Sequence, residues 1–296
     1  MKHLKLLLQL STAAVFFGRA YQYLYWDAPF RTLLWDERIM SGIVESFFSL
    51  SWEEYINSLA VDDSINQMIN GFGWFYVICG IITLGMKWMP RMIQRLILLG
   101  GVGLIFLALL LWKEKFYSVG QFFEYSLQFS LPFFFYFSYD QLTQGEEVGT
   151  KFIFWLKLAT AVTFVCHGLY AVGYYPQPVT FMEMTVEITG WSDNIASRFL
   201  KLMGFLDFVV AALIFLPKTA RPALIYMVVW GFLTALARIW TNFDFGNIAE
   251  HLHQTGFAFL YRAGHFLAPL GLWWVEKRGK ERKTPNAGSH QNPRFL

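Results

Sequence analysis

Eight long apolar segments, nearly free of charged residues, are the feature that most restricts how this chain of 296 residues can fold. They cover about residues 6–26, 65–86, 96–112, 116–138, 152–173, 199–217, 222–240 and 256–275. Each segment can cross roughly 30 Å of hydrocarbon as a helix. Residues 96–112 are apolar on every face, which excludes the alternation of a transmembrane β-strand. The sequence therefore predicts an all-α, polytopic transmembrane bundle of about eight helices.

The composition supports lipid as the solvent and excludes two classes of function. Charged residues make up 15% of the chain, whereas soluble domains carry roughly a quarter. The net charge is only +3 and the basic residues lie in short links, so nucleic-acid binding is not expected. Cys79 and Cys166 lie in separate apolar segments without a C-x-x-C pair, which argues against dithiol redox chemistry.

The basic residues also predict the orientation. On an eight-helix count, one side receives Lys2, Lys5, Lys87, Arg91, Arg95, Lys218, Arg221 and the basic tail, residues 277–296. By the positive-inside rule, both termini are cytoplasmic, as in a multi-pass protein of the cell (inner) membrane. Lys157 is expected near the cytoplasmic boundary, where it could snorkel.

The link after the first segment is long and acidic, and it is predicted on the outer side. Ser51 and Glu54 have the spacing of a capping box, and Trp52, Tyr55 and Leu59 follow at helical intervals. Two arrangements satisfy this pattern: a helix lying on the outer surface, or a cap packed over the bundle.

The two halves of the chain share a pattern of glycine and proline. Gly73 and Pro90 bracket the second segment as Gly204 and Pro222 bracket the sixth; Pro132 lies in the fourth as Pro269 does in the eighth. Each half has an even number of helices, so the repeat would be parallel. We therefore predict a first membrane repeat at 1–140, with its long outer loop, and a second at 150–276.

Ionisable side chains inside a membrane cost about 2.5–3.5 kcal/mol each on insertion scales, so they need partners or a function. Most of them fall in the outer halves of the predicted helices. The candidate ligand-binding residues are Arg19, Glu124, Gln128, His167, Asp207, Arg238, Arg262 and His265. Three arginines against two carboxylates leave an excess of positive charge. The sequence therefore predicts an outer-facing site for a small anion or a polar head group.

Other interpretations of these residues stay open. Glu124 with Arg262, and Asp207 with Arg19 or Arg238, could neutralise one another and only fix the packing of the helices. His167 and His265 could ligate a b-type haem. His251 and His253 could share a metal in an extended loop but would diverge on a helix; the prediction is that no metal is bound.

The run Cys166-His167-Gly168-Leu169-Tyr170, followed by Leu202 to Asp207 and by Ala211-Ala212, resembles the DoxX-like family of small four-helix membrane proteins. The likeness covers residues 152–275, with a fainter version over 6–138, so the chain is about twice the usual family length. By position, the polar elements of the family correspond to His167, Asp207 and Arg262. Arg19 and Tyr76 stand in the first half where the second has His167 and Asp207. A weaker likeness, through Arg19, is to the membrane portion of vitamin K-dependent carboxylase-like proteins.

The DoxX-like resemblance implies a membrane subunit of a redox complex, linked to quinone or thiosulfate, or of a stress-related complex. The expected partners are membrane lipids, a redox partner subunit and a small anion or quinone-like ligand. The sequence does not identify a cofactor; the resemblance is compatible with a quinone. The alternatives are a transporter or lipid-handling protein in which the two repeats move against each other, and an anchoring protein whose embedded charges only hold its helices together.

Overall fold

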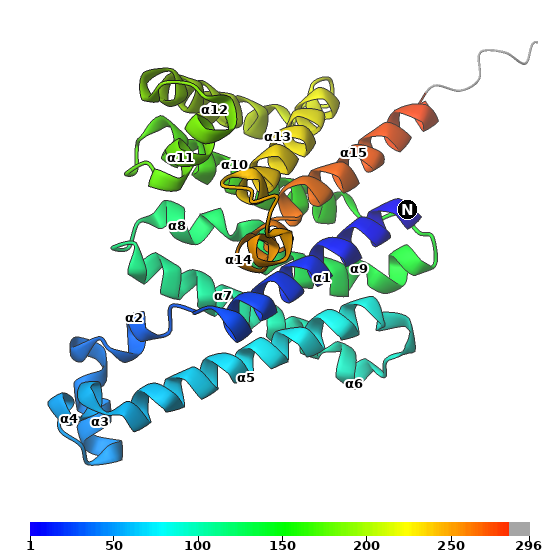
Figure 1. Ribbon diagram of the computed structural model, residues 1–296. Helices are drawn as coiled ribbons and strands as arrows, with labels where there is room; N and C mark the ends of the chain where they lie inside the picture. Colours follow the sequence, from blue (N-terminus) through cyan, green and yellow to red (C-terminus); the bar gives the residue numbers. More distant parts are fainter. Residues whose placement is uncertain (284–296) are drawn as a thin grey trace, which may run out of the picture.

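The computed structural model describes residues 1–283, and within this range the protein is built from helices and the links between them. The long helices are α1 (Lys2–Tyr25), α5 (Leu59–Leu84), α7 (Leu96–Glu114), α9 (Ser126–Thr143), α10 (Thr150–Val172), α12 (Asp193–Leu213), α13 (Ala220–Trp240), α14 (Ile248–Tyr261) and α15 (Gly264–Lys283). The short ones are α2 (Arg31–Leu34), α3 (Glu37–Phe48), α4 (Trp52–Asn57), the 3₁₀ turn Met86–Trp88, α6 (Arg91–Gln94), α8 (Val119–Glu124) and α11 (Val179–Thr189). Figure 1 shows their arrangement.

Four of these helical stretches are long and apolar enough to cross a membrane: α5, α6 with α7, α10 and α13. Every predicted segment coincides with a helix, but two segments are interrupted. The fourth breaks at Tyr125 into α8 and α9, and the eighth breaks after Tyr261 into α14 and α15. The described part of the chain therefore has fifteen α-helices where the sequence predicts about eight spans.

Helix packing is alike in the two halves of the chain. The first helix of each half packs on the second, as α1 on α5 and α10 on α12. The third packs on the last, as α7 on α9 and α13 on α15. The first helix of each half also contacts the last helix of the other: α1 contacts α15, and α10 contacts α9. The two halves thus meet through corresponding helices.

Glycines lie at corresponding helix crossings in the two halves. A Cβ on Gly204 would lie 2.8 Å from the backbone oxygen of Gly168 in α10. A Cβ on Gly73 would lie 2.8 Å from the Leu24 side chain in α1. The second helix of each half therefore approaches the first at a glycine, which only a missing side chain permits.

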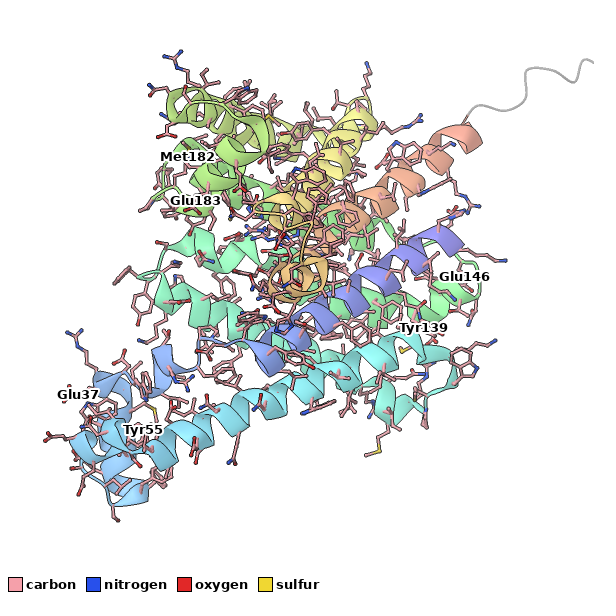
Figure 2. All side chains as sticks on the ribbon, viewed as in Figure 1. Glu37, Tyr55, Tyr139, Glu146, Met182 and Glu183 are labelled. Carbon is pink, nitrogen blue, oxygen red and sulfur yellow. The ribbon has the colours of Figure 1, made fainter. Side chains whose placement is uncertain are left out.

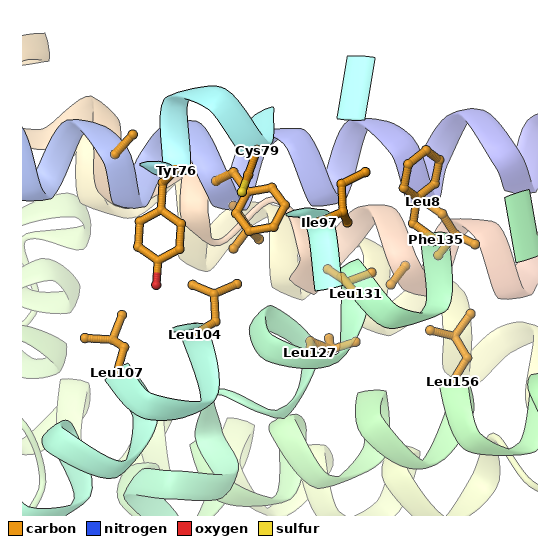
Figure 3. Close-up of a cluster of buried hydrophobic side chains, with 14 of the residues drawn as sticks. Leu8, Tyr76, Cys79, Ile97, Leu104, Leu107, Leu127, Leu131, Phe135 and Leu156 are labelled. Atoms are coloured by element: carbon orange, nitrogen blue, oxygen red, sulfur yellow. The ribbon is translucent and has the colours of Figure 1, made fainter. Parts of the chain in front are cut away.

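Apolar side chains fill the centre of the molecule and also cover its outside. Leu8, Leu127 and Phe135 belong to a continuous buried cluster (Figure 3). Large apolar side chains point outward from the long helices: Phe137 is 70% exposed, and Trp74 and Phe205 are each 61% exposed. A soluble protein does not present so much apolar surface, whereas a bundle in lipid does.

The acidic outer link forms α2, α3 and α4. Ser51 and Glu54 make the predicted capping box at the start of α4. α3 and α4 pack on each other, and α4 lies beside the start of α5, away from the other long helices (Figure 1). α2 packs on α7, and Lys113 of α7 pairs with Asp36 at the start of α3. Helix α4 is therefore not a cap over the bundle. Figure 2 shows Glu37 and Tyr55 at this end of the molecule, and Tyr139 and Glu146 at the opposite end. The N-terminus and the end of α15 also lie at that opposite end (Figure 1).

Helix α15 continues into the predicted basic tail as far as Lys283, and the rest of that tail, residues 284–296, lies outside the described range. One prediction near that opposite end needs correction. Lys157 does not snorkel, because its side chain is only 11% exposed and its Nζ lies 2.5 Å from Oε1 of Glu276 in α15. This ion pair joins the first and last helices of the second half.

We expect replacement of Lys157 with Met to lower the free energy of unfolding by about 1–3 kcal/mol, because it leaves the carboxylate of Glu276 partly buried without its partner. Reversible unfolding in mild detergent measures the change. The double variant Lys157→Met with Glu276→Leu should recover most of the loss. Equal losses in the single and double variants would contradict a coupled pair.

Candidate functional site

The two helix breaks bring polar groups into the middle of the bundle. Tyr125 ends α8 with φ −89° and ψ 7°, and Arg262 ends α14 with φ −92° and ψ −2°. Each break leaves backbone groups without helical partners. The amide of Leu127 after the first break donates to the Thr163 hydroxyl at 3.1 Å. The carbonyl of Arg262 at the second accepts a hydrogen bond from Nδ1 of His265 at 3.0 Å.

Near its helix break, each half also pairs its first helix with its last through a polar contact. In the first half, Nη2 and Nε of Arg19 donate to Oε1 of Gln128 at 2.7 and 3.2 Å. In the second half, Nε2 of His167 lies 3.1 Å from Nε2 of His265. Gln128 and His265 each stand four residues before the helix proline, as the repeat predicts. The contacts differ in chemistry but join corresponding positions.

Glu124 connects the second pair to an arginine. Its Oε1 lies 3.5 Å from Nδ1 of His167 and 3.7 Å from Nη2 of Arg262. Its Oε2 accepts from Nε2 of Gln121 at 3.3 Å, and Oε1 of Gln121 accepts from the Tyr170 hydroxyl at 3.0 Å. The predicted Glu124–Arg262 pair is therefore present, but it is part of a network that includes the histidines.

The other predicted neutralising pair is absent from the described residues. Asp207 accepts a hydrogen bond from the Tyr226 hydroxyl at 3.2 Å, and it pairs with neither Arg19 nor Arg238. Arg19 is 2% exposed, and its guanidinium lies 3.9 Å from the centre of the Tyr261 ring. It is held by amide oxygens and aromatic faces. The charge of Arg19 is thus not cancelled by a carboxylate.

A cavity of about 350 Å³ lies against this network. Five of the predicted site residues line it: His167, Asp207, Arg238, Arg262 and His265. Most of the remaining wall is apolar and includes Phe181, Met184, Ile188, Met203 and Trp230. Glu124 lies behind His167 and Arg262, whereas Arg19 and Gln128 form a separate cluster beyond Tyr261. Of the eight predicted residues, five therefore line the cavity. Glu124 contacts two of these five, and Arg19 and Gln128 form a neighbouring pair.

The arginines at this end keep hydrogen-bonding capacity. Among residues 1–283, the Nε atoms of Arg238 and Arg262 are buried and have no hydrogen-bond partner. A buried polar group without a partner costs about 1–3 kcal/mol, and more when it is charged. Two guanidinium groups thus border a cavity with part of their donors unused.

One wall of the cavity comes from a segment that sequence reasoning treated only as an outer link. Helix α11 contributes Phe181, Met184, Thr185 and Ile188. These residues recur at intervals of three and four, which is the signal of a helix with one apolar face. Gln121 and Tyr170 were also missed, and only the packing of α8 on α10 brings them together.

The histidine interpretations can be compared with the geometry. Haem ligation needs an iron between the two imidazoles, with metal–nitrogen bonds of about 2 Å on each side. The 3.1 Å contact between His167 and His265 does not leave room for it. His251 and His253 lie on helix α14 and bind different partners, the Ile239 carbonyl and the Tyr21 hydroxyl. This arrangement does not fit a shared metal.

Comparison with known proteins adds no family to this geometry. No protein-family model matches the chain, and neither a curated protein nor a solved structure matches it significantly. The resemblance to the DoxX-like family therefore stays a prediction.

Proposed function

We propose that this protein binds an amphipathic, membrane-resident ligand in the cavity beside α11, with an anionic or quinone-like head group held by Arg238, Arg262 and the two histidines. The observation that carries the proposal is the distribution of polar groups. Arginine and histidine side chains gather at one end of a cavity whose remaining wall is mostly apolar. Its volume falls in the range of small-molecule sites.

The rim of the cavity supports entry from the lipid. Ile188, Leu233 and Trp240 line the cavity, and they are 42%, 47% and 55% exposed. All three are apolar and come from α11 and α13. A water-soluble anion would have to pass this rim, whereas a ligand with an apolar tail is favoured by it.

A quinone-linked redox subunit is the specific form of this proposal that the DoxX-like resemblance favours. Imidazole and guanidinium groups can both donate to a carbonyl oxygen on which charge develops. In that role the protein would bind and orient the quinone, and a partner subunit would supply the other substrate. The transporter alternative has less support, because every lining residue lies between Phe164 and His265 in the second half.

We also propose eight spans, formed as two parallel four-helix repeats, with both termini in the cytoplasm of a cell (inner) membrane. The corresponding helix contacts and the Arg19–Gln128 and His167–His265 contacts support the repeat. The position of the N-terminus and the end of α15 at one end of the bundle supports an even number of spans (Figure 1).

Single cysteines in a variant without Cys79 and Cys166 test this topology. Glu53 and Glu146 are both exposed and lie at opposite ends of the bundle. In intact cells, a membrane-impermeant maleimide should label Glu53→Cys and leave Glu146→Cys unlabelled until the membrane is opened. Labelling of both positions, or the reverse order, would contradict the proposed orientation.

Thermal unfolding of the purified protein tests ligand binding. Three probes share a ten-carbon tail and differ in the head: decane-1-sulfonate, a decyl-substituted benzoquinone, and decanol. A probe at 100 times its Kd should stabilise the fold by about 2.7 kcal/mol. Stabilisation by the sulfonate or the quinone, with none from decanol, supports the proposal and tells the two head groups apart. No stabilisation, or an equal effect of decanol, refutes it.

A further inference from the structure

Three titratable side chains stand in a row behind the cavity. The row runs from the Arg262 carbonyl to His265, then to His167, and ends at the Glu124 carboxylate. The successive separations are 3.0, 3.1 and 3.5 Å. Nearly all of it is buried, since His265 is 4% exposed and the side chains of His167 and Glu124 are 16% and 11% exposed.

Each of the three contacts is favourable only with a hydrogen between its two atoms. A carbonyl only accepts, so Nδ1 of His265 carries a hydrogen toward Arg262. The two Nε2 atoms share one hydrogen, because two lone pairs 3.1 Å apart would repel. Nδ1 of His167 and Oε1 of Glu124 are at ion-pair distance, 3.5 Å, and a hydrogen on this nitrogen is favoured because its lone pair would otherwise face a carboxylate. All three contacts are therefore favourable only when the row holds three hydrogens.

Two neutral imidazoles and a carboxylate supply only two hydrogens. The third must be an additional proton, carried either as an imidazolium beside a carboxylate or as a neutral carboxyl group beside neutral histidine. Both forms give Glu124, His167 and His265 together a net charge of zero. Without the proton their net charge is −1.

The surroundings of the row are mostly cationic. Arg238 and Arg262 line the same cavity as the two histidines. Arg19 and Lys115 also stabilise a negative charge on Glu124. Among the described residues that line the cavity, Asp207 is the only one with a carboxylate. Asp207 is bonded to Tyr226 and lies outside the row. The helices and links packed around the row also carry ionisable side chains that are neutral, namely Tyr125, Cys166, Tyr170 and Tyr261. Addition of one proton therefore raises the positive charge beside the arginines by one.

We infer that the site binds an anionic head group together with a proton held in the Glu124–His167–His265 row. This inference rests on the proposed function and names the ligand class as an anionic amphiphile. The proton removes the negative charge of Glu124, so both arginines are free to face the anion. Affinity is then highest when the row is protonated. As pH rises and the row loses its proton, affinity should fall by up to tenfold per pH unit.

Calorimetry with decane-1-sulfonate tests the inference, because this probe keeps its charge from about pH 5 to about pH 9 while histidine and carboxyl groups titrate. In buffers of different ionisation enthalpy, the binding heat reports the number of protons taken up. We expect uptake to approach one proton per ligand at the alkaline end. Binding without proton uptake anywhere in this range overturns the inference and leaves the proposed function intact.

Glu124→Gln is the matched variant. Its amide can donate a hydrogen to His167 in the same place, and it carries neither a negative charge nor a titratable proton. Its affinity for decane-1-sulfonate should not change with pH, whereas equal pH dependence in the variant and the wild type would overturn the inference.

A measurement without ligand separates this inference from the proposed function. The wild-type protein should lose thermal stability relative to Glu124→Gln as pH rises, since only the wild-type row then lacks its third hydrogen. A constant difference in Tm across the range overturns the inference even if the probe binds. If the probe fails to bind while this difference appears, the anion-binding function fails and the protonated row stands.

Discussion

Replacement of Arg262 with Gln is expected to remove about half or more of the thermal stabilisation given by decane-1-sulfonate or the decyl benzoquinone. Arg262 lies at the break between α14 and α15, its buried Nε has no hydrogen-bond partner among residues 1–283, and its side chain lines the cavity. Loss of a hydrogen bond from a charged group costs about 1.5–3 kcal/mol, which corresponds to roughly 10- to 100-fold in affinity. Titration of Tm against probe concentration measures the change.

Two variants show whether such a loss belongs to the site. Arg262→Lys keeps the charge but not the guanidinium fork, so it should retain part of the stabilisation by the sulfonate. Arg38→Gln removes an exposed arginine from the outer link and should leave the stabilisation unchanged. An unchanged Tm shift in Arg262→Gln would remove this residue from the binding site.

Replacement of Gly231 with Ala is expected to lower the free energy of unfolding by about 1–3 kcal/mol, because it forces apart two well-packed helices. A Cβ at Gly231 in α13 would lie 2.5 Å from the backbone oxygen of His265 in α15. The substitution should also displace His265 and weaken probe binding. Denaturant unfolding and the Tm shift with probe measure the two effects.

Gly256→Ala is the matched control for this prediction. Gly256 lies within α14, and a Cβ there would meet no atom within 4 Å. Alanine should therefore stabilise the helix by about 0.5–1 kcal/mol. Equal destabilisation by both substitutions would show that the close approach of α13 to α15 is not what makes Gly231 necessary.

Much of the helical framework could be predicted because lipid constrains sequence strongly. Each predicted apolar segment coincides with a helix, since a backbone in hydrocarbon has to satisfy its own hydrogen bonds. The glycines predicted to correspond in the two halves, Gly73 and Gly204, both lie where the second helix crosses the first. The breaks at Tyr125 and Arg262 could not be predicted, because neither residue interrupts a helix by its own propensity.

The candidate site was predicted in outline but not in its pairing. The five predicted residues that line the cavity could be identified because they are ionisable residues within, or next to, apolar segments. The partners depend on helix rotation, which periodicity does not fix when a helix is apolar all round. Asp207 thus bonds to Tyr226 instead of an arginine, and His167 contacts His265 directly. The place of α11 in the cavity wall could not be predicted from sequence. Its periodicity indicates only that one face of the helix is apolar, not what that face packs against.

The position of α11 has a consequence for how ligand preference can change. This helix lies between two glycines with positive φ, Gly173 at 86° and Gly190 at 69°, and so is separated from α10 and α12 by sharp turns. In the proposed binding mode it supplies one apolar wall for the tail, beside apolar residues of α12 and α13. The proposed head-group residues His167, Arg238, Arg262 and His265 come from α10, α13, the link between α14 and α15, and α15. Exchange of one eleven-residue segment could therefore alter chain-length selectivity while head-group chemistry and bundle packing stay the same.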